Sequence, residues 1–385
     1  MKYYIIAGEA SGDLHASNLM KALFKKDPNA EIHFWGGDLM QKTGGTLIKH
    51  YKELSFMGFI EVLINITTIF KNIKFCKENI AEFNPDKIIF IDYSGFNLRI
   101  AKWAKEKGFR TNYYISPQVW ASRANRVKKI RRDIDNMFVI LPFEKEFYKK
   151  HNYDVTFVGH PLIDAIADRV HVDENEFRKK YNLSNKPIIA LLPGSRKQEI
   201  TKMLSVMLKM VNKFKDYQFV IAGAPSQEFD FYKQFINDDN VAFISNKTYD
   251  LLSVSYASLV TSGTATLEAA LFKIPQVVCY KGSNISYQIA KRIITIKFIS
   301  LVNLIMDKEV VTELIQADFN EKRLEKELNN ILNEDKRIEI FEEYHNLEEI
   351  LGGKGASEKT ASLICSTLVR FRTEDRSFAF TNEKI

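Results

Sequence analysis

An acidic residue at the end of an apolar run is the first candidate for chemistry in this sequence. Asp92 follows the apolar run 87–91 (KIIFI) and precedes Tyr93, Ser94, Gly95, Phe96 and Asn97. If the run is a strand of a parallel sheet, Asp92 points into a cleft at its carboxyl end and can accept the proton of a sugar hydroxyl as a general base. The simpler alternative is an acidic cap on the next helix.

A basic residue takes the corresponding place in the second half of the chain. The apolar run 187–192 is followed by Pro193-Gly194-Ser195-Arg196, and a helical pattern begins near residue 199. A guanidinium and a hydroxyl beside a helix N-terminus can hold a diphosphate and stabilise it as it leaves. The alternative is an ordinary basic surface residue, which a turn of this kind directly after a buried strand makes less attractive.

Two turns of small residues join apolar runs to helical ones. The turn Gly8 to Asp13 (GEASGD) precedes an expected helix from about residue 14 to 26, and the turn 261–268 (TSGTATLE) carries Glu268 one turn into the next helix. Backbone N–H groups in such turns can bind an anion, and Glu268 can accept hydrogen bonds from ribose hydroxyls. The first turn is neither a dinucleotide fingerprint nor a P-loop. A tight connection and a Thr-capped helix would explain the two turns without any ligand.

The elements that position these residues alternate between strands and helices. Strands are expected at 2–7, 87–91 and 111–115 in the first half, and at 187–192, 219–222 and 258–261 in the second. Such alternation predicts an α/β fold with parallel sheets covered on both faces, and a chain of 385 residues suggests two domains. We therefore predict two doubly wound domains, at 1–170 and 186–345, with the turns facing a cleft between them.

The segment 56–70 (FMGFIEVLINITTIF) is almost entirely apolar and is followed by Lys71, Lys74 and Lys77. It is too short to span a bilayer, but with its basic flank it could lie in a headgroup layer or line a groove for acyl chains. A buried core helix is an equally good interpretation. The candidate membrane or acyl contacts are Phe56, Met57, Phe59, Ile60, Leu63 and Ile64.

The charge balance favours anionic partners. The formal charge is +7, from 55 Lys and Arg against 48 Asp and Glu. A basic run follows the segment 117–120 (PQVW), but no zinc-finger, helix-turn-helix or RNP pattern accompanies it, so we predict no nucleic-acid partner. The run comprises Arg123, Arg126, Lys128, Lys129, Arg131 and Arg132.

Nothing in the residue spacing indicates a metal or another cofactor. Cys76, Cys279 and Cys365 have no C-x-x-C spacing, and the histidines have no H-E-x-x-H spacing. The segment 133–135 (DID) matches a known D-x-D metal motif, but it follows a basic stretch and is interpreted as a chance match. We predict no metal and no cofactor. The few cysteines and an N-terminus without a signal-peptide core favour a reducing cytoplasm.

Nine stretches of the sequence resemble the lipid-A-disaccharide synthase family, from Tyr4 to about Leu368. Their order and separation make a chance match improbable. They are AGEASGD, FMGFIEVL, IDYSGFN, YISPQVWASRANRVKKI, LPFEKEFY, FVGHPLID, LLPGSRKQEI, TSGTATLE and GGKGAS.

The resemblance implies a GT-B fold of two Rossmann-like domains, with a final helix at 357–372 that returns to the first domain. It also implies an inverting, metal-independent transfer from UDP-2,3-diacylglucosamine to 2,3-diacylglucosamine 1-phosphate, which gives a β-1,6-linked disaccharide and UDP. The source would then be Gram-negative. The protein would be cytoplasmic and peripherally bound to the anionic surface of the inner membrane, with a homodimer as a further expectation.

The resemblance also assigns roles to single residues. Asp92 would deprotonate the acceptor 6-hydroxyl, and Arg196 beside Ser195 would hold the donor diphosphate. Thr264, Glu268 and Asn303 would contact UDP. The substrate-binding set on the acceptor side would comprise Gly8, Glu9, Ser11, Gly12, Asp13 and Asn97. Many relatives carry a second aspartate where this chain has Gly95, which concentrates the expected base function on Asp92.

Two rival functions fit the same nucleotide half. One is a UDP-N-acetylglucosamine 2-epimerase or a peptidoglycan-type transferase, and the other is a membrane-surface scaffold without activity. The apolar segment near residue 60 and the stretch IDYSGFN argue against the epimerase.

Overall fold

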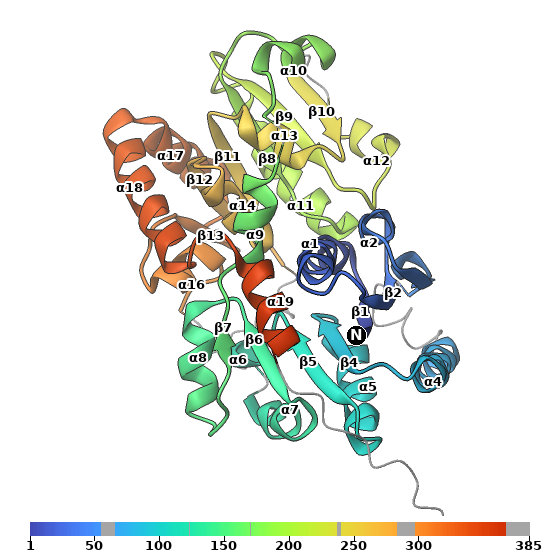
Figure 1. Ribbon diagram of the computed structural model, residues 1–385. Coiled ribbons are helices and arrows are strands. Elements are labelled where there is room, and N and C mark those ends of the chain that lie inside the picture. The colour runs from blue at the N-terminus through green and yellow to red at the C-terminus, as the bar shows by residue number, and fades with distance from the viewer. Residues whose placement is uncertain (55–65, 123, 170, 237–239, 283–296, 367–385) are drawn as a thin grey trace, which may run out of the picture.

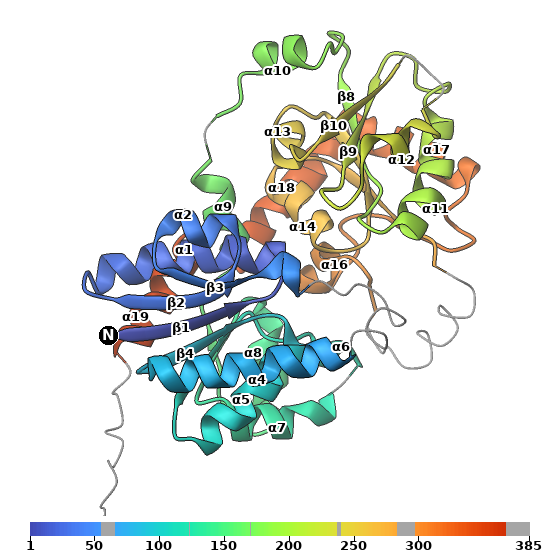
Figure 2. The same ribbon diagram turned by 90° about the vertical axis from the view of Figure 1, so that its right-hand side faces the viewer.

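Two parallel sheets, each covered by helices on both faces, form the two halves of the molecule (Figures 1 and 2). The computed structural model describes residues 1–54, 66–122, 124–169, 171–236, 240–282 and 297–366. Within these residues the first sheet has seven strands in the order β3-β2-β1-β4-β5-β6-β7, and the second has six in the order β10-β9-β8-β11-β12-β13. The predicted α/β fold with two doubly wound parallel sheets is confirmed.

Six of the thirteen described strands, β1, β4, β5, β8, β9 and β11, coincide closely with the six predicted runs, and the other seven were not predicted. In the first sheet the strands are β1 Lys2–Ala7, β2 Glu31–Gly36, β3 Thr46–His50, β4 Lys87–Ile91, β5 Arg110–Tyr114, β6 Asn136–Val139 and β7 Thr156–Phe157. In the second they are β8 Ile188–Leu192, β9 Gln218–Gly223, β10 Val241–Ser245, β11 Ala257–Thr261, β12 Gln276–Tyr280 and β13 Glu313–Ile315.

Helices connect and cover these strands. Those of the first half are α1 Ala10–Lys26, α2 Asp38–Thr43, α4 Ile66–Phe83, α5 Ser94–Glu106, α6 Val119–Ser122, α7 Val127–Asp133, α8 Pro142–Lys149 and α9 Pro161–Ala167. The remaining ones are α10 Glu174–Lys180, α11 Lys197–Met207, α12 Phe229–Lys233, α13 Thr248–Ser253, α14 Thr264–Leu271, α16 Leu301–Met306, α17 Glu321–Leu332, α18 Glu334–Ile350 and α19 Ala356–Ser366.

The central strands are apolar on both sides because helices bury both faces of each sheet. In the first sheet, Tyr3 and Ile5 belong to the core beneath α1 and α19. Tyr4, Ile6 and Phe90 point to the opposite face, which α4, α5 and α7 cover. This two-sided burial explains why the sequence shows continuous apolar runs instead of alternation.

Within the described residues, two segments connect the halves. Helix α9 packs against α1 and α19 of the first half and against α14 of the second. Helix α18 lies on the second half, and after the glycine-rich segment 352–355 helix α19 packs against α1. The carboxylate of Asp164 in α9 accepts hydrogen bonds from the backbone N–H groups of Gly355 (2.6 Å) and Ser357 (3.0 Å), which fixes the start of α19. The domain boundaries inferred from the sequence stay predictions.

The first helix begins earlier than the sequence suggested. It was expected from about residue 14, but α1 begins at Ala10, so the connection after β1 is only Gly8 and Glu9. A β-carbon on Gly12 would lie 3.3 Å from the β-carbon of Ala7. The missing side chain at Gly12 therefore lets the first turn of α1 pack closely on β1.

Candidate active site

The predicted residues gather at one position in each sheet. Strands β1 and β4 are neighbours in the first sheet, but the chain continues from β1 toward one edge of the sheet and from β4 toward the other. Strands β8 and β11 have the same relation in the second sheet. Ligands of open parallel sheets bind at such a switch point, beyond the carboxyl ends of the strands. Gly8 and Asp92 follow the first pair of strands, and the turns at Ser195 and Gly263 follow the second pair.

Asp92 has an unusual backbone conformation. Its φ is 42° and that of Tyr93 is 46°, which are left-handed values that cost a non-glycine residue roughly 1–2 kcal/mol. The hydroxyl of Tyr113 and the side-chain amide of Asn97 (2.9 Å) both donate to the backbone carbonyl of Asp92. The backbone N–H of Asp92 donates to the carbonyl of Tyr114 at 3.2 Å. Hydrogen bonds from buried neighbours thus hold the backbone of Asp92, from which the carboxylate projects, in one place.

The loops after β1 and β4 are locked together by Gly8 and Tyr93. A β-carbon on Gly8 would lie 2.2 Å from the ring of Tyr93, so only glycine fits beneath this ring. The ring of Tyr93 is also stacked near that of Phe96, with 5.7 Å between centroids. The position of Asp92 therefore depends on the absence of a side chain at residue 8.

The electrostatic surroundings of Asp92 suit a general base. Burial, with a smaller contribution from the nearby Glu9 carboxylate, raises the pKa of Asp92 to about 6. A carboxylate with this pKa is mostly deprotonated at neutral pH, but it is a stronger base than an ordinary aspartate. Glu9 itself is exposed at the start of α1.

Two residues expected to bind substrate, Asn97 and Asp13, have hydrogen-bond partners within the fold. Asn97 is fully buried, and its amide donates to the carbonyls of Asp92, Ile91 (3.2 Å) and Ile6 (3.4 Å). The carboxylate of Asp13 is 3% exposed and accepts hydrogen bonds from the first backbone N–H groups around α2. These come from Gly37 (2.7 Å), Leu39 (3.0 Å) and Met40 (3.1 Å). In this arrangement Asn97 and Asp13 shape the loops, whereas Ser11 is exposed.

The side chain of Arg196 is exposed and forms no hydrogen bond or ion pair with the part of the chain that the structure describes. Arg196 is the N-cap residue of α11, so its backbone stands at the positive end of a helix, where an anion can bind. Gly194 has a φ of 101°, and a β-carbon there would lie 2.3 Å from the carboxylate of Glu199. That carboxylate accepts a hydrogen bond from the backbone N–H of Ser195 (3.1 Å), which fixes the turn.

The turn after β11 and the helix that follows it present one exposed and one half-buried polar residue. Thr264 is exposed at the first position of α14. Glu268 lies one turn later and accepts a hydrogen bond from the hydroxyl of Tyr249 at 2.9 Å. Burial raises the pKa of Glu268, and the hydrogen bond from Tyr249 opposes this shift. Thr264 and Glu268 can thus offer a hydroxyl and a carboxylate as hydrogen-bond partners to the hydroxyls of a sugar.

Asn303 was expected to contact a nucleotide, but its side chain is buried and bonded within the fold. Its amide donates to the carbonyl of Val311 (2.8 Å) and to Glu313 (2.9 Å), and its oxygen accepts from the N–H groups of Val310 (2.8 Å) and Val311 (3.0 Å). Glu313 in turn accepts from the N–H groups of Ile299 and Ser300, both at 2.9 Å. Asn303 thus ties α16 to the segment 310–313, and Glu313 holds the residues just before α16.

Tyr113, Tyr249 and Glu199 support the site, and the sequence did not single them out for this. The partners of the two tyrosine hydroxyls, Asp92 and Glu268, lie 21 and 19 positions away, so no local spacing signals them. Glu199 carried a usable signal, because an acidic residue in the first turn of a helix often bonds the preceding turn.

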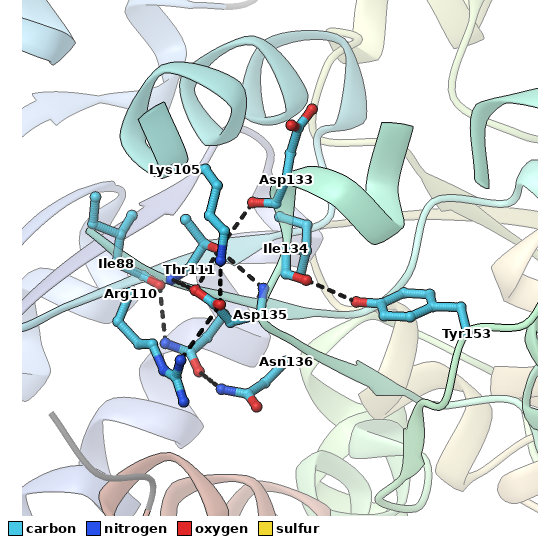
Figure 3. A network of polar contacts seen from close by, with 10 residues as sticks. Ile88, Lys105, Arg110, Thr111, Asp133, Ile134, Asp135, Asn136 and Tyr153 are labelled. Carbon is cyan, nitrogen blue, oxygen red and sulfur yellow. Dashed lines mark hydrogen bonds and ion pairs between the residues drawn. The ribbon is translucent and has the colours of Figure 1, made fainter. Parts of the chain in front are cut away.

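The D-x-D match lies at the other end of the first sheet. Asp135 precedes β6, at the amino end of the strands, and Figure 3 shows its carboxylate among Lys105, Arg110 and Thr111. It accepts hydrogen bonds from the backbone N–H (3.0 Å) and the hydroxyl (3.2 Å) of Thr111, and Asp133 is paired with Arg132. These carboxylates stabilise the start of the strand, away from the switch point. Among the described residues no group of three or more His, Cys, Asp and Glu could hold a metal ion.

The candidate membrane contacts, Phe56 to Ile64, lie outside the described residues. Helix α4, which follows them, leaves Phe70 61% exposed and Phe75 44% exposed, and Lys71 and Lys74 flank these rings. Within the described residues, no helix is both long enough and apolar enough to cross a membrane.

Comparisons with known proteins agree along almost the whole chain. A family model described as lipid-A-disaccharide synthetase matches residues 3–365. The lipid-A-disaccharide synthase of Syntrophus aciditrophicus is 38% identical over 375 residues, which cover 95% of this chain and 97% of the relative. That of Coxiella burnetii is 35% identical over 366 residues, 94% of this chain and 96% of the relative.

Solved structures of low sequence identity share the fold. A UDP-GlcNAc 2-epimerase from Neisseria meningitidis bound to UDP-GlcNAc has a TM-score of 0.69 at 14% identity, with 95% of this chain and 100% of that chain covered. An epimerase from Methanocaldococcus jannaschii in complex with UDP-GlcNAc and UDP has a TM-score of 0.65 at 14% identity, over 95% of this chain and 99% of that one. At such identities the likeness concerns the fold alone.

The family match and the sequence relatives decide between the rival functions raised by the sequence. The relatives at 35% and 38% identity are synthases, whereas the epimerases are related only through the fold. The chain therefore belongs to the lipid-A-disaccharide synthase family, whose members are glycosyltransferases, and it has the GT-B fold.

Proposed function

We propose that the chain transfers the acylated glucosamine of UDP-2,3-diacylglucosamine to 2,3-diacylglucosamine 1-phosphate, with inversion at the transferred carbon. The products are the β-1,6-linked disaccharide 1-phosphate and UDP. The observation that carries this proposal is the carboxylate of Asp92, held in a left-handed backbone at the switch point of the first sheet with a pKa raised to about 6.

The chemistry needs one base and one stabilised leaving group. Asp92 takes the proton of the acceptor 6-hydroxyl while the oxygen of that hydroxyl forms a bond to the anomeric carbon of the donor. The bond from that carbon to the diphosphate oxygen breaks, and its electron pair leaves with UDP. Arg196 and the backbone N–H groups at the start of α11 stabilise the charge that develops on the diphosphate. A single displacement of this kind inverts the carbon and requires no nucleophile from the protein.

The first half would bind the acceptor and the second half the nucleotide of the donor, on opposite sides of a cleft between the domains. Gly8, Glu9 and Ser11 would border the acceptor, and Ser195, Thr264 and Glu268 would contact the nucleotide. The bonding of Asp13, Asn97 and Asn303 within the fold supports a positioning role for these three residues instead of direct contact. Gly12 contributes by letting α1 pack closely on β1.

The direct test measures disaccharide formation and UDP release from both acylated substrates in detergent with EDTA. Wild type should be active, and Asp92→Asn and Arg196→Ala should each lose at least about a hundredfold in kcat/KM. Asp135→Asn removes a carboxylate just before β6, at the amino end of the strands, and the variant should keep its turnover per folded molecule. A wild type that forms no disaccharide but converts UDP-N-acetylglucosamine would refute the proposal in favour of an epimerase.

We also propose peripheral binding to the cytoplasmic face of an anionic membrane, through the segment 56–64 and the basic, aromatic start of α4. The exposed Phe70 and Phe75 and their lysine neighbours support this, because apolar and cationic groups together favour the headgroup layer. Glutamate substitutions at Phe59 and Ile60 should reduce co-sedimentation with anionic vesicles. Unchanged sedimentation would contradict the proposal.

A homodimer, expected from the resemblance, stays a prediction that sedimentation velocity would check.

A further inference from the structure

A chain of polar and aromatic contacts begins just after α9, where the backbone crosses from the first half to the second. Arg169 forms an ion pair with Asp250 of α13. Its guanidinium carbon also lies 5.4 Å from the centre of the Tyr249 ring and 5.3 Å from that of Phe272. One guanidinium therefore faces two rings and pairs with one carboxylate, an arrangement that its planar shape permits.

Tyr249 continues the chain of contacts to the candidate nucleotide site. Its ring packs near that of Phe272, with 5.4 Å between centroids, and its hydroxyl donates to Oε1 of Glu268 at 2.9 Å. Glu268 belongs to α14, which directly follows the switch-point turn. The hydrogen bond to Oε1 fixes the orientation of this carboxylate and leaves its second oxygen available as an acceptor.

Arg169 belongs to the segment that joins the two halves of the molecule. Residue 169 follows α9, and α9 packs on α1 and α19 in the first half as well as on α14 in the second. The side chain of Arg169 is 20% exposed, so its ion pair is well shielded from solvent. The segment that joins the two halves is thereby tied to the carboxylate expected to bind ribose.

We propose that Arg169 is a positioning residue for the nucleotide of the donor: it aligns the ring of Tyr249, whose hydroxyl orients Glu268 toward the ribose hydroxyls. This inference rests on the proposed function, in which Glu268 contacts UDP. Orientation before binding lowers the entropy lost when the ligand immobilises the carboxylate. Removal of one such restraint should weaken UDP binding about three- to tenfold.

The test is isothermal titration of UDP into the full-length protein and its variants. Arg169→Met, which keeps an unbranched chain without charge, and Tyr249→Phe, which removes only the hydroxyl, should each weaken binding about three- to tenfold. Lys247→Met is the matched control. Lys247 pairs with the same Asp250 at 3.1 Å from the N-cap position of α13, so its loss should leave UDP affinity within about twofold of wild type.

A double-mutant cycle separates positioning from a general structural effect. If Arg169 acts through Tyr249, Arg169→Met should add little to the loss in Tyr249→Phe, and neither should weaken binding further in a Glu268→Gln background. Arg169→Lys retains the charge but lacks the planar group, so it should restore part of the affinity.

Two failures are distinguishable. If wild type binds UDP and Glu268→Gln weakens it while Arg169→Met and Tyr249→Phe bind as wild type does, the positioning role is wrong and the proposed function stands. The positioning role is also wrong if the losses of UDP affinity in Arg169→Met and Tyr249→Phe add fully in the double variant. If wild type and Glu268→Gln bind UDP equally, or not at all, the assignment of Glu268 to the nucleotide fails, and this inference fails with it.

Discussion

The hydroxyl of Tyr113, on strand β5, donates a hydrogen bond to the backbone carbonyl of Asp92 at the end of β4. Asn97 donates to the same carbonyl from the first turns of α5. Both donors are fully buried, and the residue that they hold has a left-handed backbone. Strained backbone persists only where surrounding contacts determine it, so the position of the candidate base is fixed before substrate arrives.

Tyr113→Phe should lower kcat by about tenfold and leave KM nearly unchanged. The substitution removes one of two hydrogen bonds to the Asp92 carbonyl, so the carboxylate samples less productive positions, whereas the substrate contacts remain. Steady-state kinetics with both substrates checks this.

Tyr153→Phe provides the matched control for that substitution. Tyr153 is also a buried tyrosine on the same face of the first sheet, but its hydroxyl donates to the carbonyl of Ile134 (3.2 Å), near the amino end of β6. The Tyr153→Phe substitution should lower the stability of the protein without lowering kcat. Equal kcat values for the two variants would show that Tyr113 has no role in positioning Asp92.

Asp92→Gly should give a more stable protein than Asp92→Ala, although both are inactive. Glycine adopts a φ of 42° without strain, whereas alanine keeps the steric cost of roughly 1 kcal/mol. The difference should appear as a melting temperature that is a few degrees higher for the glycine variant. A glycine variant that melts below the alanine variant would mean that the conformation at residue 92 is not strained, because alanine is the more stable residue at an unstrained position.

The activity should rise with pH through an inflection near 6. Asp92 must be deprotonated to act as a base, and burial together with Glu9 raises its pKa to about 6, so kcat/KM falls as the pH drops below this value. Glu9→Gln removes a negative charge that favours the protonated form. The pKa of Asp92 should fall, and the inflection should move to lower pH. An inflection that moves to higher pH, or does not move, would contradict the contribution of Glu9.

The sheet strands could be predicted from the sequence because burial on both faces makes their composition distinctive. The apolar runs at β1, β4, β8 and β11 are bounded by small or polar residues, and parallel sheets place those boundaries at one edge. This reasoning located Asp92, Arg196 and the turn at Thr264 beyond the strand ends without knowledge of the packing.

Side-chain partners could not be predicted, because residue type does not specify which atoms meet. Asp13 looked like a ligand in a phosphate-sized loop, but α1 begins three residues before it and its carboxylate caps α2. Asn303 was assigned to a nucleotide through a resemblance, yet its amide and oxygen are bonded to the segment 310–313. Small polar residues serve equally well in loops and in ligand sites, and only the tertiary contacts separate the two uses.

Gly8→Ala should lower both stability and activity, whereas Gly95→Ala should lower neither. A β-carbon at residue 8 would lie 2.2 Å from the Tyr93 ring, and the ring cannot move without disturbing the adjacent Asp92. Overpacking of this kind costs about 1–3 kcal/mol. Among the described residues, apart from its chain neighbours and its own helix backbone, no atom lies within 4 Å of the corresponding position at Gly95. This residue is in the first turn of α5, where alanine favours the helix. Thermal melting and kcat, measured on both variants, give the comparison. A Gly8→Ala enzyme with wild-type kcat would show that the contact between the two loops does not determine where the base lies.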